Sequence, residues 1–506
     1  MKNNNLMKKI VDLLNDSILC VILCISMFLF TVLFSLLKLP NMSVVFGIIG
    51  SVFLLFNVKK IVCNYMSISF LFTAFHTLYG LAGPISVVWF DGLTSTYGSE
   101  YNIFPYMIAY SLASIFYCIG FYFCSKKKNI KNDNDYHDII SLKKSKLNNY
   151  RNYFLFIAQC GFFLVFVFEL INFLRAGGIS TVIRGKAIYQ AAVDELRFTL
   201  PTIQLSQVSI ASLSVYLFIS FNKNQSISKK GILFTCLFFL PYLALLIFLA
   251  RRGIILTYII MFCLGFYQYK PMQKITKKAI LIVVLLYFSL GLMFAARNNT
   301  KLIFSDFKSF ITKTFSKNNL ITAFNPGKNE FGCTFGNFNR LYIRNDYNFL
   351  YGKSYIQGIT HIVPSYFYVG EKPKLLMYEF RDKYFPRKAE ISSIAGTAFS
   401  SILEAFWNFW YFGMIVYAIY GYIICSIELK YKKKNMFNLM KYFVFAPFIY
   451  EFHRSDFGHI SYEIILCLLM ILVIQFFYKF FCTKKGLISQ LINQITRFSI
   501  GNNYEK

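Results

Sequence analysis

The sequence has very few charged side chains for its length. Only 15% of its 506 residues are Asp, Glu, Lys or Arg, whereas 56% are hydrophobic and 19% are aromatic. A soluble domain of this size needs a more polar surface, so the composition excludes that class. Several apolar runs reach the ~18–20 residues that a helix needs to cross a bilayer, and such continuous runs indicate helices rather than the strands of a membrane barrel. We therefore predict an all-α polytopic membrane protein.

The common metal and nucleotide motifs are also missing. The 12 cysteines are scattered, with no CxxC pair and no Cys/His cluster of zinc spacing. There is no P-loop and no GxGxxG run, so ATP or dinucleotide binding is not indicated. Asp133-Asn134-Asp135 matches an Asp-x-Asp metal motif, but it lies in a short Lys-rich loop and is interpreted as a solvated charge run. We predict no cofactor and no metal site.

Acidic residues are scarce, with 23 Asp and Glu against 53 Lys and Arg and a net charge of +30. Cytoplasmic loops of membrane proteins are rich in Lys and Arg, which explains most of this excess without a nucleic-acid partner. With about twelve transmembrane helices, the Lys-rich segments that connect them all fall on the cytoplasmic side. We therefore predict a protein of the plasma (inner) membrane with both termini in the cytoplasm. The predicted spans are residues 17–37, 41–57, 62–82, 103–123, 152–174, 201–221, 231–250, 254–269, 279–296, 403–425, 437–452 and 461–481.

One long polar segment, 297–402, interrupts the apolar pattern and is predicted to be a large extracytoplasmic loop. The N-terminal transmembrane helices then occupy 1–296, the C-terminal ones 403–481, and a basic cytoplasmic tail 482–506. Within the loop, 302–315 and 373–385 have helix-like patterns. No internal repeat is visible, which disfavours a transporter built from inverted repeats.

Basic residues on the outward side break the charge rule and need another cause. The main ones are Arg184, Arg251, Arg252 and Arg297. A guanidinium group binds phosphate oxygens bidentately and stays charged at any pH, so several arginines at one membrane face predict a pyrophosphate-binding site. The alternative is that each arginine extends separately to lipid headgroups.

Two polar residues share a helical face at the outer mouth of a span. Glu404 and Asn408 are four residues apart. A carboxylate at this depth is costly unless it is paired or used, so Glu404 is a candidate catalytic residue and Asn408 a candidate substrate-binding residue. The alternative for Glu404 is an ion pair with an outward arginine. Glu330, in the long loop, is a weaker substrate-binding candidate.

The last outward turn carries His453, Arg454 and Asp456, and the long loop carries His361. Histidine titrates near neutral pH, so either histidine is a candidate general base. We place His453, Asp456 and His361 among the candidate catalytic residues and Arg454 among the pyrophosphate-binding ones. The alternative is that these histidines are structural.

Three short patterns occur at span ends and in the long loop. They are Arg251-Arg252-Gly253, Tyr351-Gly352-Lys353-Ser354-Tyr355 followed by Val363-Pro364, and Phe399-Ser400 followed by Glu404, Asn408 and Gly413. Together they resemble the signature of the Wzy-type O-antigen polymerases, also called oligosaccharide repeat unit polymerases, over about 170–425. The glycine after Asn408-Phe409 is displaced relative to the family pattern.

The resemblance implies a lipid-dependent, multi-span glycosyltransferase of GT-C-like architecture. Such an enzyme transfers a glycan from undecaprenyl pyrophosphate to the sugar end of a new lipid-linked repeat unit, at the outer face of the membrane, in lipopolysaccharide or other polysaccharide biosynthesis. The outward arginines would hold the pyrophosphate without a metal. The implied partners are undecaprenyl-pyrophosphate-linked oligosaccharides and the lipid bilayer, with a chain-length regulator and a flippase of the same pathway as further candidates.

Three other functions stay open at this point. A lipid-linked oligosaccharide flippase would also have many spans, but its charges would line a path at mid-membrane. An O-antigen ligase has nearly the same chemistry and topology. A non-enzymatic scaffold of the assembly complex needs none of the candidate residues.

Overall fold

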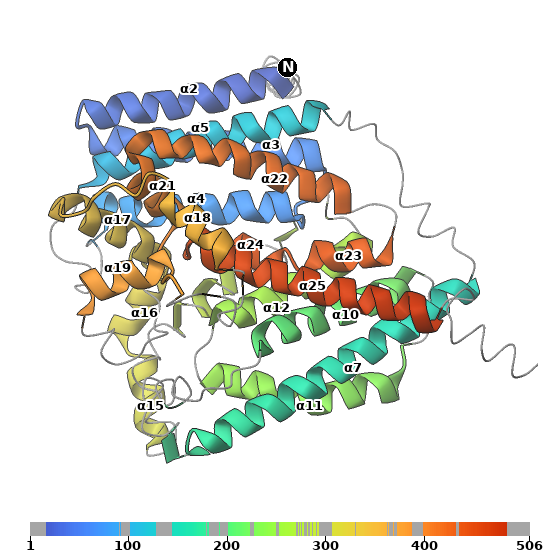
Figure 1. Ribbon diagram of the computed structural model, residues 1–506. Helices are drawn as coiled ribbons and strands as arrows, with labels where there is room; N and C mark the ends of the chain where they lie inside the picture. The colour runs from blue at the N-terminus through green and yellow to red at the C-terminus, as the bar shows by residue number, and fades with distance from the viewer. Residues whose placement is uncertain are drawn as a thin grey trace, which may run out of the picture.

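Long helices lie side by side across the molecule in the structure, which is a computed structural model (Figure 1). It describes residues 17–90, 102–127, 144–178, 201–222, 227–248, 252–269, 306–328, 330–361, 372–386, 398–431 and 435–482, with isolated positions between them, most of them within 272–292. Every regular element in these residues is a helix. Nine of these helices are long and apolar enough to cross a membrane. The predicted all-α polytopic class is confirmed.

The elements fall into three groups along the chain. The first group is α2 (Ser17–Leu36), α3 (Pro40–Val62), α4 (Ile68–Trp89), α5 (Ile103–Lys127), α7 (Lys144–Arg175), α10 (Thr202–Asn222), α11 (Lys229–Phe248) and α12 (Arg252–Tyr269). The long loop contains α15 (Phe307–Thr314), α16 (Lys317–Phe324), η3 (Glu330–Gly332), α17 (Cys333–Arg344), α18 (Lys353–Thr360) and α19 (Leu376–Tyr384). The last group is α21 (Ser401–Phe409), η5 (Trp410–Ile415), α22 (Val416–Tyr431), α23 (Met436–Phe443), α24 (Ala446–Glu451) and α25 (Phe457–Cys482).

Most predicted spans coincide with a long helix, and two differ in an informative way. The predicted span 62–82 is displaced, because α4 begins only after Ser67, whose side chain accepts a hydrogen bond from the Phe70 N–H at 3.1 Å. The predicted span 437–452 is divided into α23 and α24, with Val444 and Phe445 between them. Segment 279–296 is described only at isolated positions, so the total of twelve spans stays a prediction.

The long loop is packed onto the ends of the N-terminal helices. Phe335 and Phe338 of α17 are fully buried, and both rings meet the Tyr106 ring of α5 edge-on at 5.0 and 5.2 Å between centroids. Gly83 of α4 makes room for this helix, since a Cβ there would lie 2.4 Å from the Phe335 Cβ. The helix-like pieces predicted in the loop correspond to α15 and α19. The patterns did not predict α17, the best-packed helix of the loop.

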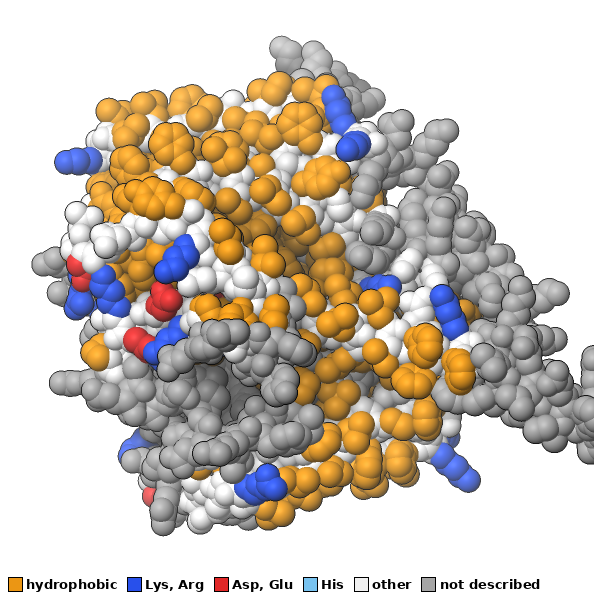
Figure 2. Space-filling view, in the orientation of Figure 1, with side chains coloured by type: hydrophobic (Ala, Val, Ile, Leu, Met, Phe, Trp, Pro, Cys, Tyr) orange, Lys and Arg blue, Asp and Glu red, His pale blue; other side chains and the backbone are white. Residues whose placement is uncertain are grey.

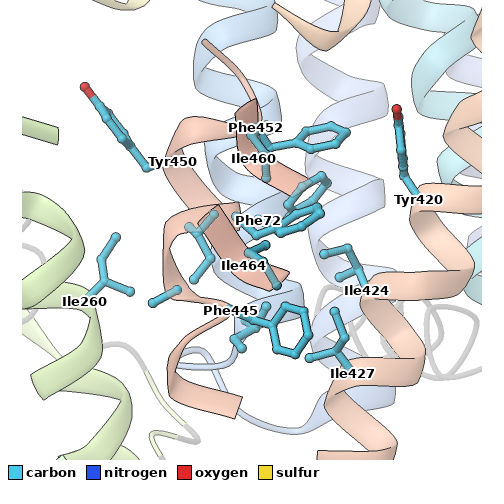
Figure 3. Packing of buried hydrophobic residues seen from close by; sticks show 14 of the residues in the cluster. Phe72, Ile260, Tyr420, Ile424, Ile427, Phe445, Tyr450, Phe452, Ile460 and Ile464 are labelled. Atoms are coloured by element: carbon cyan, nitrogen blue, oxygen red, sulfur yellow. The ribbon is translucent and has the colours of Figure 1, made fainter. Parts of the chain in front are cut away.

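Hydrophobic side chains cover the middle of the face shown in Figure 2, and charged ones gather towards two opposite edges. This distribution suits a bundle whose sides face lipid and whose ends face water. Inside, Phe72 of α4 packs against Phe452 with ring centroids 5.1 Å apart, and Ile464 of α25 lies beside them (Figure 3). This core fixes the ends of α24 and α25, next to which the candidate site is built.

Candidate active site

A buried carboxyl group lies at the centre of the candidate site. Glu404 is in the first turn of α21 and is 1% exposed. One carboxylate oxygen accepts a hydrogen bond from the Ser354 hydroxyl at 2.7 Å, and the other accepts from the Phe457 N–H at 2.7 Å. No Lys or Arg of the described residues forms an ion pair with it. Glu404 therefore joins α21 to the first turn of α18 and to the first residue of α25.

Asn408 extends this joint by one helical turn along α21. Its amide nitrogen donates to the Ser354 hydroxyl at 2.7 Å and to the Glu404 carbonyl at 2.8 Å. Its amide oxygen accepts from the Gly352 N–H at 2.9 Å. The Tyr351 N–H also donates to the Asn408 carbonyl at 3.1 Å. Residues 350–354, which we call the strap, are thus held along α21 by both side-chain and backbone hydrogen bonds.

The strap turns into α18 at Gly352, which has φ +85°. This left-handed conformation favours glycine, because a side chain there crowds the following carbonyl oxygen. A Cβ at this position would also lie 3.0 Å from the Phe409 Cζ. The glycine of the Tyr-Gly-Lys-Ser-Tyr pattern is therefore required by the turn that delivers Ser354 to Glu404.

Replacing Gly352 with Ala should lower the free energy of unfolding by about 1–2 kcal/mol, the usual cost of a left-handed non-glycine residue. The neighbouring exposed residue offers a matched control, and Lys353→Ala should change stability by less than about 0.5 kcal/mol. Chemical denaturation of the purified protein in detergent measures both. Equal stability of the two variants would show that the turn does not need glycine.

A second buried carboxyl group caps the same end of α25. Asp456 accepts hydrogen bonds from the His459 N–H and the Met377 N–H, each at 2.8 Å. Burial raises the pKa of Asp456, and these hydrogen bonds limit the rise because they favour the charged form. The N-terminus of a helix also attracts negative charge. Asp456 thereby holds the start of α19 against the end of α25 that Glu404 contacts.

His361 directly follows the last residue of α18 and is half-buried. Its ring lies 5.9 Å from the Tyr462 ring of α25, measured between centroids. Within the described part of the chain, its Nδ1 has no hydrogen-bond partner. Burial, together with the positive charge of Lys372, lowers the pKa of His361. The imidazole is therefore neutral at pH 7, with one ring nitrogen that can accept a proton.

His453 points into the bundle rather than out of the last turn. It is 3% exposed, and its ring centroid lies 4.7 Å from that of Phe72 and 5.6 Å from that of His76, both on α4. Its Nε2 has no partner among the described residues. His453 follows α24 directly, and its ring contacts residues of α4 and Phe452.

Arg454 lies on the opposite side of that turn, against α24. Its guanidinium group contacts the Tyr450 hydroxyl and lies 3.9 Å from a Glu451 carboxylate oxygen. The start of α12 packs here too, because a Cβ on Gly253 would lie 2.6 Å from the other Glu451 oxygen. Gly253, near the start of α12, therefore reaches the same end of α24 as Arg454.

The remaining predicted residues lie wholly or partly outside the described part of the chain. Arg184, Arg251 and Arg297 are outside it. Arg252 begins α12 and Glu330 begins η3, but their side chains are not described. In the described residues no group of three or more His, Cys, Asp or Glu is placed to hold a metal ion.

Comparison with known families tests the resemblance seen in the short patterns. The family model described as "O-antigen polysaccharide polymerase Wzy" matches residues 14–485, which include α12, the strap, α21 and α25. The chain belongs to the Wzy family. No curated protein and no solved structure gives a significant match. The resemblance seen in the short patterns is thereby confirmed.

Two of the Wzy patterns meet in space. The Tyr-Gly-Lys-Ser-Tyr pattern supplies Gly352 and Ser354, and the pattern after Phe399-Ser400 supplies Glu404 and Asn408. Ser354 belongs to the first pattern, but no local signal predicts its contact with a residue 50 positions away. The hydrogen bonds explain why the two patterns occur together in one chain.

Residues outside any predicted set also shape the site. Ser400 caps α21 by accepting a hydrogen bond from the Leu403 N–H at 3.1 Å, and so fixes the first turn that carries Glu404. Gly358 and Gly458 allow α18 to cross α25 closely, since a Cβ on Gly358 would lie 2.7 Å from the Gly458 Cα. A serine before an apolar run is a recognisable capping signal. The glycine pair had no local signal, because its reason is a contact between distant segments.

Proposed function

We propose that this Wzy protein polymerises the repeat units of a surface polysaccharide. It transfers an undecaprenyl-pyrophosphate-linked glycan chain to the sugar end of a new lipid-linked repeat unit, at the outer face of the plasma membrane. Family membership over residues 14–485 is the observation that carries this proposal. The buried joint of the strap, α21 and α25 supports it, because that joint fixes loop residues against membrane helices where a lipid-borne substrate reacts. Both termini are proposed to be cytoplasmic, with the long loop outside.

The reaction breaks the bond between the anomeric carbon of the donor and the pyrophosphate oxygen. That oxygen leaves with the electron pair, while an acceptor hydroxyl forms the new bond and gives up its proton. Negative charge thus develops on the leaving group, and preorganised cations lower the barrier most when they face it. We assign this role to Arg251, Arg252, Arg297, Arg184 and Arg454. The contact of Gly253 with Glu451 supports it by bringing α12 to Arg454.

The arginines make a metal-independent reaction the simplest form of this proposal, since guanidinium groups supply the charge that Mg²⁺ would otherwise supply. Glu330 is proposed to orient sugars. Asn408, a candidate substrate-binding residue by sequence, is proposed to position the strap, because its buried amide already bonds Gly352, Ser354 and Glu404. A chain-length regulator and a flippase of the same pathway are proposed as partners. If a chelator abolished the activity of the purified protein and Mg²⁺ restored it, the metal-independent form would be wrong.

For the proton of the acceptor hydroxyl, the contacts favour His361 over the other candidates. Within the described residues its Nδ1 is buried without a hydrogen-bond partner, and His361 follows the last residue of α18, the helix whose first turn carries Ser354. Glu404 and Asp456 already accept hydrogen bonds with both oxygens, and His453 faces the bundle interior. We propose Glu404 and Asp456 as residues that position the site. Glu404 can accept the proton only if the acceptor hydroxyl displaces Ser354 from its carboxylate. His453 can accept it only if the turn between α24 and α25 opens and exposes the imidazole.

The pH dependence of the rate tests His361. Because burial and Lys372 lower its pKa, the neutral base should persist below the ordinary histidine value of 6.5. The rate should therefore stay constant down to pH 6.5 and fall only below it. His361→Gln should reduce the rate by about 100-fold and remove the acid limb. An acid limb that survives in His361→Gln would assign the base to another residue.

A gel of surface glycan from a strain lacking the gene, beside the complemented strain, tests the function itself. We expect the ladder to collapse to a core carrying a single repeat unit, since export and ligation still proceed. Loss of even the single repeat from the surface would indicate a flippase or a ligase. An unchanged ladder would show that the protein is not needed for polymerisation and has at most an accessory role in glycan assembly.

A further inference from the structure

The first two helices of the long loop form an amphipathic pair. Phe307 and Ile311 of α15 and Phe315, between α15 and α16, follow each other at helical spacing and are 62%, 39% and 50% exposed. The pair also carries Lys308, Lys313 and Lys317. Exposed apolar side chains beside lysines are typical of helices that lie in the interface of a bilayer with anionic groups.

The position of the α15–α16 pair in the fold is consistent with a location at the bilayer interface. A cavity of about 550 Å³ separates α16 from the end of α4 and is lined by Phe90, Phe315, Lys317, Leu320, Ile321 and Phe324. Phe90 directly follows Trp89, which ends α4 and is 44% exposed, as expected of an aromatic residue at a membrane–water interface. The cavity therefore lies where a membrane helix emerges, and its wall is apolar except for one lysine and Asn325.

The cavity also adjoins the segment that leads to Arg297. Phe324 of α16 stacks on Phe288 with ring centroids 4.7 Å apart, and a Cβ on Gly291 would lie 2.6 Å from the Ala323 carbonyl oxygen. Asn325, at the end of α16, accepts a hydrogen bond from Ser86 of α4 at 2.6 Å. These contacts fix α16 between α4 and the segment that precedes Arg297.

We propose that this cavity binds the isoprenoid chain of the lipid-linked substrate, with Lys317 facing its phosphate end. The inference rests on the proposed function and adds where the lipid is held. A volume of 550 Å³ lies within the range of about 300–1,000 Å³ that is typical of ligand pockets. It accommodates only the part of an undecaprenyl chain nearest the phosphate, and the rest extends into the bilayer. A wall that is apolar except for Lys317 and Asn325 suits a single apolar chain that ends in a phosphate, which is the form of an isoprenoid phosphate rather than of a two-chain phospholipid.

Native mass spectrometry of the purified full-length protein tests this with undecaprenyl phosphate and phosphatidylglycerol as separate probes. Leu320→Trp fills the cavity and should lower the apparent affinity for undecaprenyl phosphate at least fivefold, with phosphatidylglycerol unaffected. Ile343→Trp is the matched control, because it adds the same side chain on α17 at a 42% exposed position that does not line the cavity. This control should bind both lipids like the wild type.

Lys317→Glu gives a second measurement that does not require the protein to fold with a tryptophan in the cavity. It should weaken binding of undecaprenyl phosphate and leave undecaprenol, which has no phosphate, unchanged. Equal losses of phosphatidylglycerol and undecaprenyl phosphate would identify a general lipid site and overturn the proposal, as would no change in any variant. If undecaprenyl phosphate binds and the variants weaken its binding as expected, but the purified protein does not polymerise, the proposed function is refuted while the lipid-binding cavity stands.

Discussion

Replacing Glu404 with Ala is expected to destabilise the protein by about 2–5 kcal/mol and to abolish polymer formation. The change leaves the Ser354 hydroxyl and the Phe457 N–H without the acceptors they now have at 2.7 Å. An unpaired buried polar group costs about 1–3 kcal/mol. The strap and the start of α25 also lose the residue that holds them together, so stability and activity should fall in parallel.

The isosteric variant Glu404→Gln separates positioning from proton transfer. Its amide oxygen can accept from Phe457 while its nitrogen donates to Ser354, so the loss of stability should be no more than half that of Glu404→Ala. If Glu404 positions the strap, activity should follow stability across Glu404→Gln, Ser354→Ala and the double variant. A double-mutant cycle should give a coupling energy above about 0.5 kcal/mol. Full stability with no activity in Glu404→Gln would instead make Glu404 the base, and additive effects would contradict the hydrogen bond.

Replacing Arg252 with Ala should slow polymerisation by about 100- to 1000-fold while the protein still inserts into the membrane. This is the usual cost of removing one group that stabilises developing charge in a transition state, about 3–4 kcal/mol. Arg252→Lys should recover only part of the rate, since it restores the charge without the bidentate fork. The initial rate of chain elongation in proteoliposomes measures both, with membrane abundance determined in parallel by immunoblot.

An arginine outside the proposed site provides the control for Arg252. Arg344 ends α17 and stacks its guanidinium group over the Tyr384 ring at 5.6 Å. Arg344→Ala should leave the rate within twofold of the wild type. Normal elongation by Arg252→Ala would remove this arginine from the mechanism. Equal losses of rate in both variants would show that the loss is not specific to the position of Arg252.

The fold class followed from the sequence because twenty-residue apolar runs have almost no other use in a protein. The break in 437–452 was missed because the segment is largely apolar, with Asn438, Lys441 and Glu451 as its exceptions. Pro447 lies in the first turn of α24 and was the available signal, since proline is favoured at the start of a helix and interrupts its interior. After α24, His453 lies buried against α4 and Arg454 lies at the end of α24 that Gly253 of α12 approaches.

Part of the candidate site was also visible in the sequence. The four-residue spacing of Glu404 and Asn408 predicted a shared helical face, and the Asn408 amide indeed donates to the Glu404 carbonyl at 2.8 Å. The alternative considered for Glu404, an ion pair with an arginine, is not among its described contacts, which are with Ser354 and Phe457. These partners could not be predicted, because they depend on how α18 crosses α25 rather than on any local pattern.

The most direct test of the central claim is reconstitution of the purified protein in proteoliposomes with a synthetic undecaprenyl-pyrophosphate-linked repeat unit as the only substrate. Mass spectrometry of the lipid extract should show a series of lengthened lipid-linked glycans together with free undecaprenyl pyrophosphate. The series should be missing with Glu404→Ala and Arg252→Ala. Movement of intact repeat units across the bilayer without elongation, or transfer only after a lipid A–core acceptor is added, would contradict a polymerase.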